Sequence, residues 1–165
     1  FLMTATPINM HLLEHYSLSK TGVVIQLHIM SMFLPSLFTG HLLKKFGHSK
    51  MIYTGVSLYV IAVLLSFLEP SFLIYIIALV LLGLGWNLLY LSGTSLLVSS
   101  YQEEEKFKAQ GFNDILVFSI QALASLSAGY VLSMTSWNTM NVIVIPFLIL
   151  IVFTSIRADL SKVKH

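Results

Sequence analysis

The sequence has no cysteine and few charged residues. The absence of cysteine excludes disulfides, thiolate metal ligands and a cysteine nucleophile within this chain. Only 10% of the 165 residues are charged and 56% are hydrophobic, whereas about a quarter of a soluble domain is charged. The net charge is only +2, with no block of Lys and Arg interleaved with aromatics, so nucleic acid is not an expected partner. A lipid bilayer is the expected solvent of this surface.

Nucleotide-binding loops are also absent. Gly83-Leu-Gly85 has neither a third glycine nor a preceding strand, and no G-x-x-x-x-G-K-[ST] loop occurs, so ATP hydrolysis within this chain is excluded and no cofactor is expected. The pattern His11-Leu-Leu-Glu14-His15 matches a zinc-protease motif but has no evident third ligand. An intramembrane metalloenzyme is therefore a remote alternative, and we expect neither a metal site nor enzymatic activity.

Long apolar runs between the charge clusters predict membrane-spanning helices. The hydrocarbon core of a bilayer, about 30 Å thick, needs roughly 20 apolar residues per helix. The runs do not alternate in polarity as barrel strands do. We predict one all-α domain, residues 1–165, whose six transmembrane helices cover residues 1–13, 21–43, 51–68, 71–100, 109–134 and 137–156. The first run starts at Phe1 with no basic segment before it, so we expect a helix truncated at its start.

The distribution of Lys and Arg predicts the orientation, because cytoplasmic connections are enriched in basic residues. If connections 44–50 and 101–108 and the C-terminus are cytoplasmic, the other side holds only Lys20. The cytoplasmic side then holds Lys44, Lys45, Lys50, Lys106, Lys108, Arg157, Lys162 and Lys164. We expect a multi-pass protein of the plasma membrane, in bacteria the inner membrane, with a cytoplasmic C-terminus.

The two halves of the chain are related by an offset of 89 positions. Small residues of 21–43 then align with small residues of 109–134: Gly22 with Gly111, Ser36 with Ser125, and Gly40 with Gly129. Small residues let helix backbones approach closely. Because these two runs cross the membrane in opposite directions, the pattern predicts an inverted repeat of three helices plus three, as in many secondary transporters.

Several motifs resemble the major facilitator superfamily of secondary transporters. The segment from Gly40 to Lys50 is similar to that family's cytoplasmic loop between the second and third helices of each half, and Gly40, Lys45, Gly47 and Lys50 match in kind. Lys44 stands where the signature has Asp, which fits the degenerate copy in the second half. Residues 106–113 and 122–129 are similar to the entry into the eleventh helix, and Met3-Thr-Ala-Thr-Pro7, Gly85-Trp-Asn87 and Gly93-Thr94 resemble one bacterial branch.

The resemblance implies that the six helices are family helices seven to twelve, so that the missing N-terminal half of the same transporter is a partner. It implies a small-molecule substrate moved by alternating access and driven by a gradient, with coupling to a proton or another ion left open. In the family fold, the third and sixth helices of each half face lipid. Helices 51–68 and 137–156 are the least polar here, so the other four should line a cavity.

Polar and aromatic side chains of those four helices are candidates for the substrate cavity: Thr6, Asn9, Gln26, His28, Trp86, Asn87, Tyr90 and Gln121. An aromatic and an amide near the midplane suit an organic substrate with hydrogen-bonding groups, and a histidine can carry a coupling proton near neutral pH. Each of them has an alternative role in helix packing, around Gly83 and Gly85 or beside Pro7.

A second set of candidates forms the cytoplasmic loop and gate: Gly40, Lys44, Lys45, Gly47, Lys50, Asn113 and Asp114. Asp114 is the only carboxylate within a predicted span, and a carboxylate inside a membrane is energetically costly. Three roles stay open for it: a structural charge at the helix start or in an ion pair, a cytoplasmic gate, and proton coupling.

Two classes of function therefore compete. The first is a gradient-driven carrier of a small solute, of which this chain is one half. The second is a non-transporting scaffold or receptor-like membrane protein, in which the buried polar groups only pack. Polar residues grouped on cavity-facing helices favour the carrier.

Single cysteines at Ser49 and Ser136 test the topology, because the two positions fall in connections expected on opposite sides and these 165 residues contain no other cysteine. In intact cells, a membrane-impermeant thiol reagent should label Ser136→Cys. Ser49→Cys should react only after the membrane is opened. Labelling of both from the same side would refute the topology.

Overall fold

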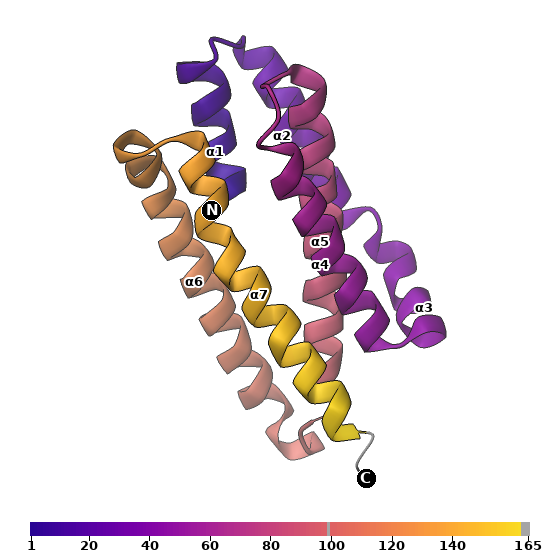
Figure 1. Ribbon diagram of the computed structural model, residues 1–165. Helices are drawn as coiled ribbons and strands as arrows, with labels where there is room; N and C mark the ends of the chain where they lie inside the picture. Colours follow the sequence, from indigo (N-terminus) through magenta and orange to yellow (C-terminus); the bar gives the residue numbers. More distant parts are fainter. Residues whose placement is uncertain (99, 163–165) are drawn as a thin grey trace.

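The computed structural model describes residues 1–98 and 100–162, which form a bundle of helices without strands (Figure 1). Its elements are α1 (Leu2–Ile8), a π-helical segment (Asn9–Leu13), α2 (Leu18–Phe33), α3 (Ser36–Phe46), α4 (His48–Leu65), α5 (Phe72–Val98), a 3-10 turn (Glu103–Glu105), α6 (Lys106–Met134) and α7 (Trp137–Lys162). The predicted all-α fold is confirmed.

Four helices within the described ranges, α4, α5, α6 and α7, are long and apolar enough to cross a membrane. The pair α2 and α3 makes a fifth span if the bent pair counts as one. The segment predicted as the first span comprises only seven residues of α1 and five of the π-helical segment. Six crossings therefore stay a prediction.

The predicted helix 21–43 is wrong in one respect, because it is broken at Pro35 and α2 and α3 meet at 43°. Proline has no N–H for the carbonyl four residues before it, and its ring displaces the preceding turn. The bend at Pro35 also takes the next N–H groups away from the carbonyls of Met32 and Phe33. The side chain of Ser36 donates to the carbonyl of Phe33 at 2.5 Å, and the amide of Asn87 in α5 donates to that of Met32 at 2.7 Å. Side chains thus replace the donors that the helix lacks.

Helix α5 is the centre of the bundle, and glycines allow its close contact with two neighbours. A Cβ on Gly83 would lie 2.7 Å from the carbonyl oxygen of His28 and would collide with the hydroxyl of Ser31, both in α2. A Cβ on Gly85 would lie 2.9 Å from the carbonyl oxygen of Gly55 in α4. Because lipid tails are as apolar as leucine, such close packing is a main source of helix association in a membrane.

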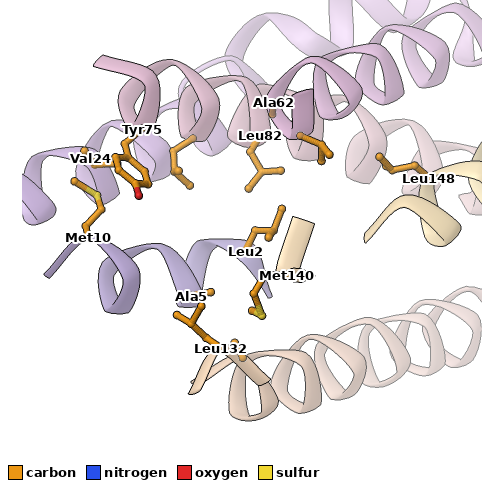
Figure 2. Packing of buried hydrophobic residues seen from close by; sticks show 13 residues of the cluster. Leu2, Ala5, Met10, Val24, Ala62, Tyr75, Leu82, Leu132, Met140 and Leu148 are labelled. Atoms are coloured by element: carbon orange, nitrogen blue, oxygen red, sulfur yellow. The ribbon is translucent and has the colours of Figure 1, made fainter. Parts of the chain in front are cut away.

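The buried apolar cluster holds α1 against the rest of the bundle (Figure 2). Its members come from seven elements and include Leu2, Ala5, Met10, Val24, Tyr75, Leu82, Leu132 and Met140. Helices α6 and α7 contribute two residues each, and the two from α6, Ala128 and Leu132, are the only buried residues described for that helix. Helix α7 lies at the rim as expected, while α6 has a long face without a neighbour in this chain.

The basic connections lie toward one end of the bundle. In Figure 1 the α3–α4 turn, the α5–α6 connection and the end of α7 are toward the lower end, and the α1–α2, α4–α5 and α6–α7 connections are toward the upper end. This arrangement agrees with the predicted grouping of the connections, while the side of the membrane that each group faces stays a prediction. Lys164, one of the basic residues counted for it, lies outside the described residues.

Helix boundaries follow the predicted internal repeat. Helix α4 begins at His48 and α7 at Trp137, which is the offset of 89 seen in the sequence. Helix α6 corresponds to α2 and α3 together but is unbroken, because Ala124 stands in the place of Pro35. The repeat therefore extends to the helix boundaries but not to the break.

Candidate functional site

A cavity of about 390 Å³ lies between the helices on both sides of α1. Its lining includes Met3 and Thr4 of α1, His28 and Met32 of α2, Tyr59 of α4, Leu82 and Trp86 of α5, Gln121 and Ser125 of α6, and Val144 of α7. Its volume falls within the roughly 300–1,000 Å³ of small-molecule sites. Of the eight cavity candidates, the structure places His28, Trp86 and Gln121 on this wall.

His28 is held in one orientation. Its Nδ1 lies 2.7 Å from the carbonyl oxygen of Leu79, and because a carbonyl can only accept, Nδ1 carries the hydrogen. The side chain is buried. The other ring nitrogen, Nε2, is then an acceptor in the neutral ring and is the atom that can accept a hydrogen bond or a proton.

Trp86 lines the cavity, and two aromatic neighbours fix its ring. Its ring stacks on Tyr90, with centroids 4.7 Å apart and planes 8° from parallel, and meets the ring of Phe33 edge-on at 6.0 Å. The predicted residue Tyr90 does not line the cavity itself but supports Trp86 from behind. A tryptophan fixed in this way can stack against a planar ligand.

Gln121 forms the opposite polar part of the wall on α6. It is exposed, and the described residues give it no hydrogen-bond partner. One turn further on, Ser125 Oγ lies 3.0 Å from Thr4 Oγ1, which links α6 to α1. The amide of Gln121 is therefore available to donate to and accept from a ligand.

Two of the polar candidates, Thr6 and Asn9, are used by the fold. Thr6 is buried and its hydroxyl donates to the carbonyl of Leu2 at 2.8 Å. Asn9 is buried and its Nδ2 donates to the hydroxyl of Tyr75 at 2.6 Å, which joins the π-helical segment to α5. These side chains have the packing role that the sequence left as the alternative.

Asn87 also serves the fold, and Gln26 lies away from the cavity. Asn87 is buried, donates to the Met32 carbonyl and accepts from the Thr39 hydroxyl at 2.6 Å, so it connects α5 to both sides of the break. Gln26 is exposed on α2 and does not line the cavity.

Tyr59 is a cavity residue that the sequence reasoning missed, because helix 51–68 was expected to face lipid only. A Cβ on Gly85 would lie 3.0 Å from the Tyr59 ring, so this glycine makes the space for the ring. The signal was an aromatic hydroxyl near the middle of an apolar helix, where Tyr59 is one of two tyrosines. Helix α4 therefore faces the cavity along one side as well as the outside.

The loop candidates surround a backbone turn that requires glycine. Gly47 has φ 80°, ends α3 and precedes α4, and its N–H donates to the Leu43 carbonyl at 2.9 Å. Glycine adopts positive φ without steric cost, which explains its place in the motif. Gly40, Lys44, Lys45 and Lys50 are all exposed around this turn.

Asp114 and Asn113 lie near the beginning of α6. Asp114 is exposed and accepts from Asn113 Nδ2 at 3.3 Å, its only hydrogen bond among the described residues. Helices α3 and α6 are at opposite edges of the bundle (Figure 1). Asp114 is therefore not positioned to pair with Lys44 or Lys45 in this conformation.

The zinc-protease pattern does not assemble a metal site. His11 Nδ1 lies 2.8 Å from the Tyr16 carbonyl and so donates to it, and His15 occupies a turn with φ 56°. Among the described residues no group of three or more His, Cys, Asp or Glu side chains is close enough to hold a metal ion. Nothing in this part of the chain supports the metalloenzyme alternative.

The family model of the Major Facilitator Superfamily matches residues 1–164. The riboflavin transporter RfnT of Brucella anthropi is 35% identical over 155 residues, which are 92% of this chain and 38% of that protein. The MFS-type transporters YddS and YdeG of Bacillus subtilis, both named as uncharacterized, are each 37% identical over 86% of this chain and 33% of their own length. No solved structure matches.

The chain thus spans about a third of the length of these relatives. Together with the apolar helices, the matches show a multi-pass membrane protein. They favour a carrier over the scaffold or receptor-like alternative, and they point to a transporter rather than an enzyme.

Asn87→Leu should destabilise the full-length protein, because it leaves the Met32 carbonyl without its donor at a buried helix break. An unpaired buried polar group costs roughly 1–3 kcal/mol, which should lower the thermal unfolding midpoint in detergent. Gln121→Leu is the matched control, since this exposed amide has no partner to lose among the described residues. Equal losses in both variants would contradict the structural role of Asn87.

Proposed function

Since this chain belongs to the Major Facilitator Superfamily, we propose that it is the C-terminal half of a gradient-driven, alternating-access carrier of a small organic solute. The partner is the N-terminal half of the same protein, for which the relatives leave room because the matched segment is only 33–38% of their length. The Gly40 to Lys50 loop supports the C-terminal placement, because Lys44 stands where the first-half signature has Asp. The open face of α6 supports a second half packed beside it.

The observation that carries this proposal is the cavity. Helices from both repeats wall it, and it combines an aromatic plane at Trp86, an acceptor at His28 and an amide at Gln121. An alternating-access carrier holds its substrate near the middle of the membrane between its repeats. Trp86 and Gln121 both lie near the middle of long helices, at the depth such a site requires.

The lining favours a planar solute with hydrogen-bonding groups at its edge. Such a molecule would stack on Trp86 and bond Gln121 and His28 Nε2. Riboflavin has a flat ring system with polar edges, and the relative from Brucella anthropi is named a riboflavin transporter. Riboflavin is therefore the first solute to test.

The proposed location is the plasma membrane, with the C-terminus, the α3–α4 turn and the α5–α6 connection in the cytoplasm. The exposed basic side chains described in these segments support it: Lys44, Lys45, Lys50, Lys108 and Arg157. His28 is the residue proposed for proton coupling, if the carrier uses protons, because its Nε2 can take up a proton from the cavity.

Asp114, Asn113 and the lysines of the loop are proposed as parts of the cytoplasmic gate. Asp114 precedes Gln121 by two helical turns, about 10 Å along α6, which is too far for contact with a solute held at Gln121. Because α3 lies across the bundle, the cation that pairs with Asp114 when the gate closes belongs to the N-terminal half.

Uptake by the full-length protein tests the function, with Gln121→Leu and Gln26→Leu as a matched pair. Both variants remove an exposed amide, but only Gln121 lines the cavity. Gln121→Leu should weaken solute binding about tenfold, since hydrogen bonds to a ligand are worth roughly 0.5–1.5 kcal/mol each and the amide can make two. Gln26→Leu should transport normally. Vesicles in which the intact protein moves no flavin or other planar solute above an empty control would overturn the proposal.

Asp114→Asn in the full-length protein tests the gate, because it preserves shape and removes only the charge. Equilibrium binding of the solute should stay within a few-fold, while transport turnover should fall. Loss of binding at normal expression would place Asp114 in the substrate or proton site. Unchanged turnover would leave it as a charge at the start of a helix.

A further inference from the structure

A second hollow, separate from the cavity, runs along the outside of the bundle between α4 and α7. This groove has a volume of about 430 Å³, and its lining side chains are all aliphatic or phenylalanine. Val56, Val63 and Leu148 are buried and form its floor, while Leu64 and Ile149 are exposed at its rims. Phe67 shares a neighbouring hollow with Trp137 at the start of α7, so α4 lines the half of the groove toward that end and α7 lines the other half. The half lined by α7, from Ile145 to Ile156, extends about 16 Å at 1.5 Å per residue, which is the depth of one bilayer leaflet.

The groove is built from equivalent residues of the two repeats. The five lining residues of α4 are Val56, Val60, Val63, Leu64 and Phe67. At the offset of 89 they correspond to Ile145, Ile149, Val152, Phe153 and Ile156, and all five of these line the groove from α7. The remaining lining residue, Leu148, corresponds to Tyr59, which faces the cavity. The apolar surface is therefore nearly the same at both ends of the groove.

Charge distinguishes the two ends. At the end predicted to be cytoplasmic, Arg157 follows Ile156, and its guanidinium carbon lies 5.1 Å from the centre of the Phe153 ring. The repeat-equivalent of Arg157 is Leu68 at the opposite end, where Glu69 follows. Glu69 and Glu14 line a hollow that Phe67 shares with the groove. Arg157 is thus the described charge beside one end, whereas two carboxylates lie near the other, where Lys20 is held over the Phe72 ring.

We propose that this groove binds one acyl chain of an anionic phospholipid of the cytoplasmic leaflet, with the phosphate at Arg157. An apolar groove with a cation at one end matches an amphiphile with one anionic head. The carboxylates at the other end disfavour the reversed orientation by repulsion. The guanidinium of arginine suits phosphate because its donors can bond two phosphate oxygens at once.

A lipid tail fits the groove better than a protein segment does. A helix is about 10–12 Å across with its side chains, so it would rest on the exposed rims at Leu64 and Ile149 and leave the floor unfilled. A single hydrocarbon chain can follow the floor along the half of the groove that α7 lines.

Photo-crosslinking in the full-length protein tests the site directly. A benzophenone amino acid replaces Ile149, in the half of the groove that α7 lines, in vesicles of phosphatidylglycerol and phosphatidylcholine with identical acyl chains. Illumination should give adducts of phospholipid mass, enriched in phosphatidylglycerol over its share of the vesicle. Arg157→Gln should reduce that enrichment about fivefold, the effect of one basic residue near an anionic headgroup.

Lys108→Gln is the matched control, because this exposed lysine is at the same end of the bundle on α6 and away from the groove. It should leave the enrichment unchanged. Equal effects of the two substitutions would mean a general surface attraction and would overturn the site. Adducts between two protein copies, or no lipid adduct, would overturn it too. If the Ile149 variant does not fold, the probe at Val60 gives the same test from α4.

Discussion

The structure depends on one constraint: backbone polar groups inside a membrane must be satisfied by the protein, because lipid offers no hydrogen bonds. Helices satisfy their backbone groups along their length. At the break at Pro35, backbone carbonyls have no helical donor and need one from elsewhere in the protein. The amide of Asn87 meets this need by donating to the Met32 carbonyl and accepting from the Thr39 hydroxyl. Asn87, a polar residue in the middle of the apolar helix α5, is thus hydrogen-bonded to the backbone of α2 and to a side chain of α3. These two bonds fix α5 against both helices.

Once α5 is fixed, its glycines determine where the cavity forms. Gly83 brings α2 close on one side and Gly85 brings α4 close on the other, so His28 and Tyr59 reach the same space as Trp86. Helix α6 is held across from them mainly through α1, by the buried cluster and the Thr4–Ser125 contact. Rigid packing on one side and a single supporting helix on the other suit a site whose two walls move relative to each other.

The repeat has different consequences inside and outside the bundle. On the outside, the equivalent positions of α4 and α7 are all apolar, and together they line a continuous groove. Inside, equivalent positions diverged: Tyr59 corresponds to Leu148, and the broken pair α2 and α3 to the unbroken α6. Divergence inside creates the variety of polar groups that recognition of a solute requires, whereas contact with lipid asks only for apolar side chains.

The sequence by itself determined the membrane class, the family resemblance, the approximate helix boundaries, the offset of 89 and Gly47 as a loop residue. These depend on local composition and spacing, since a bilayer imposes span length and apolarity on each helix separately. Only the tertiary structure decided which polar residues face the cavity. Asn9, Asn87, His28 and Gln121 are alike in the sequence as polar residues in apolar runs. A neighbouring helix supplies partners to Asn9 and Asn87 and occupies one nitrogen of His28, while Gln121 has no partner among the described residues, and such contacts between distant segments leave no local pattern.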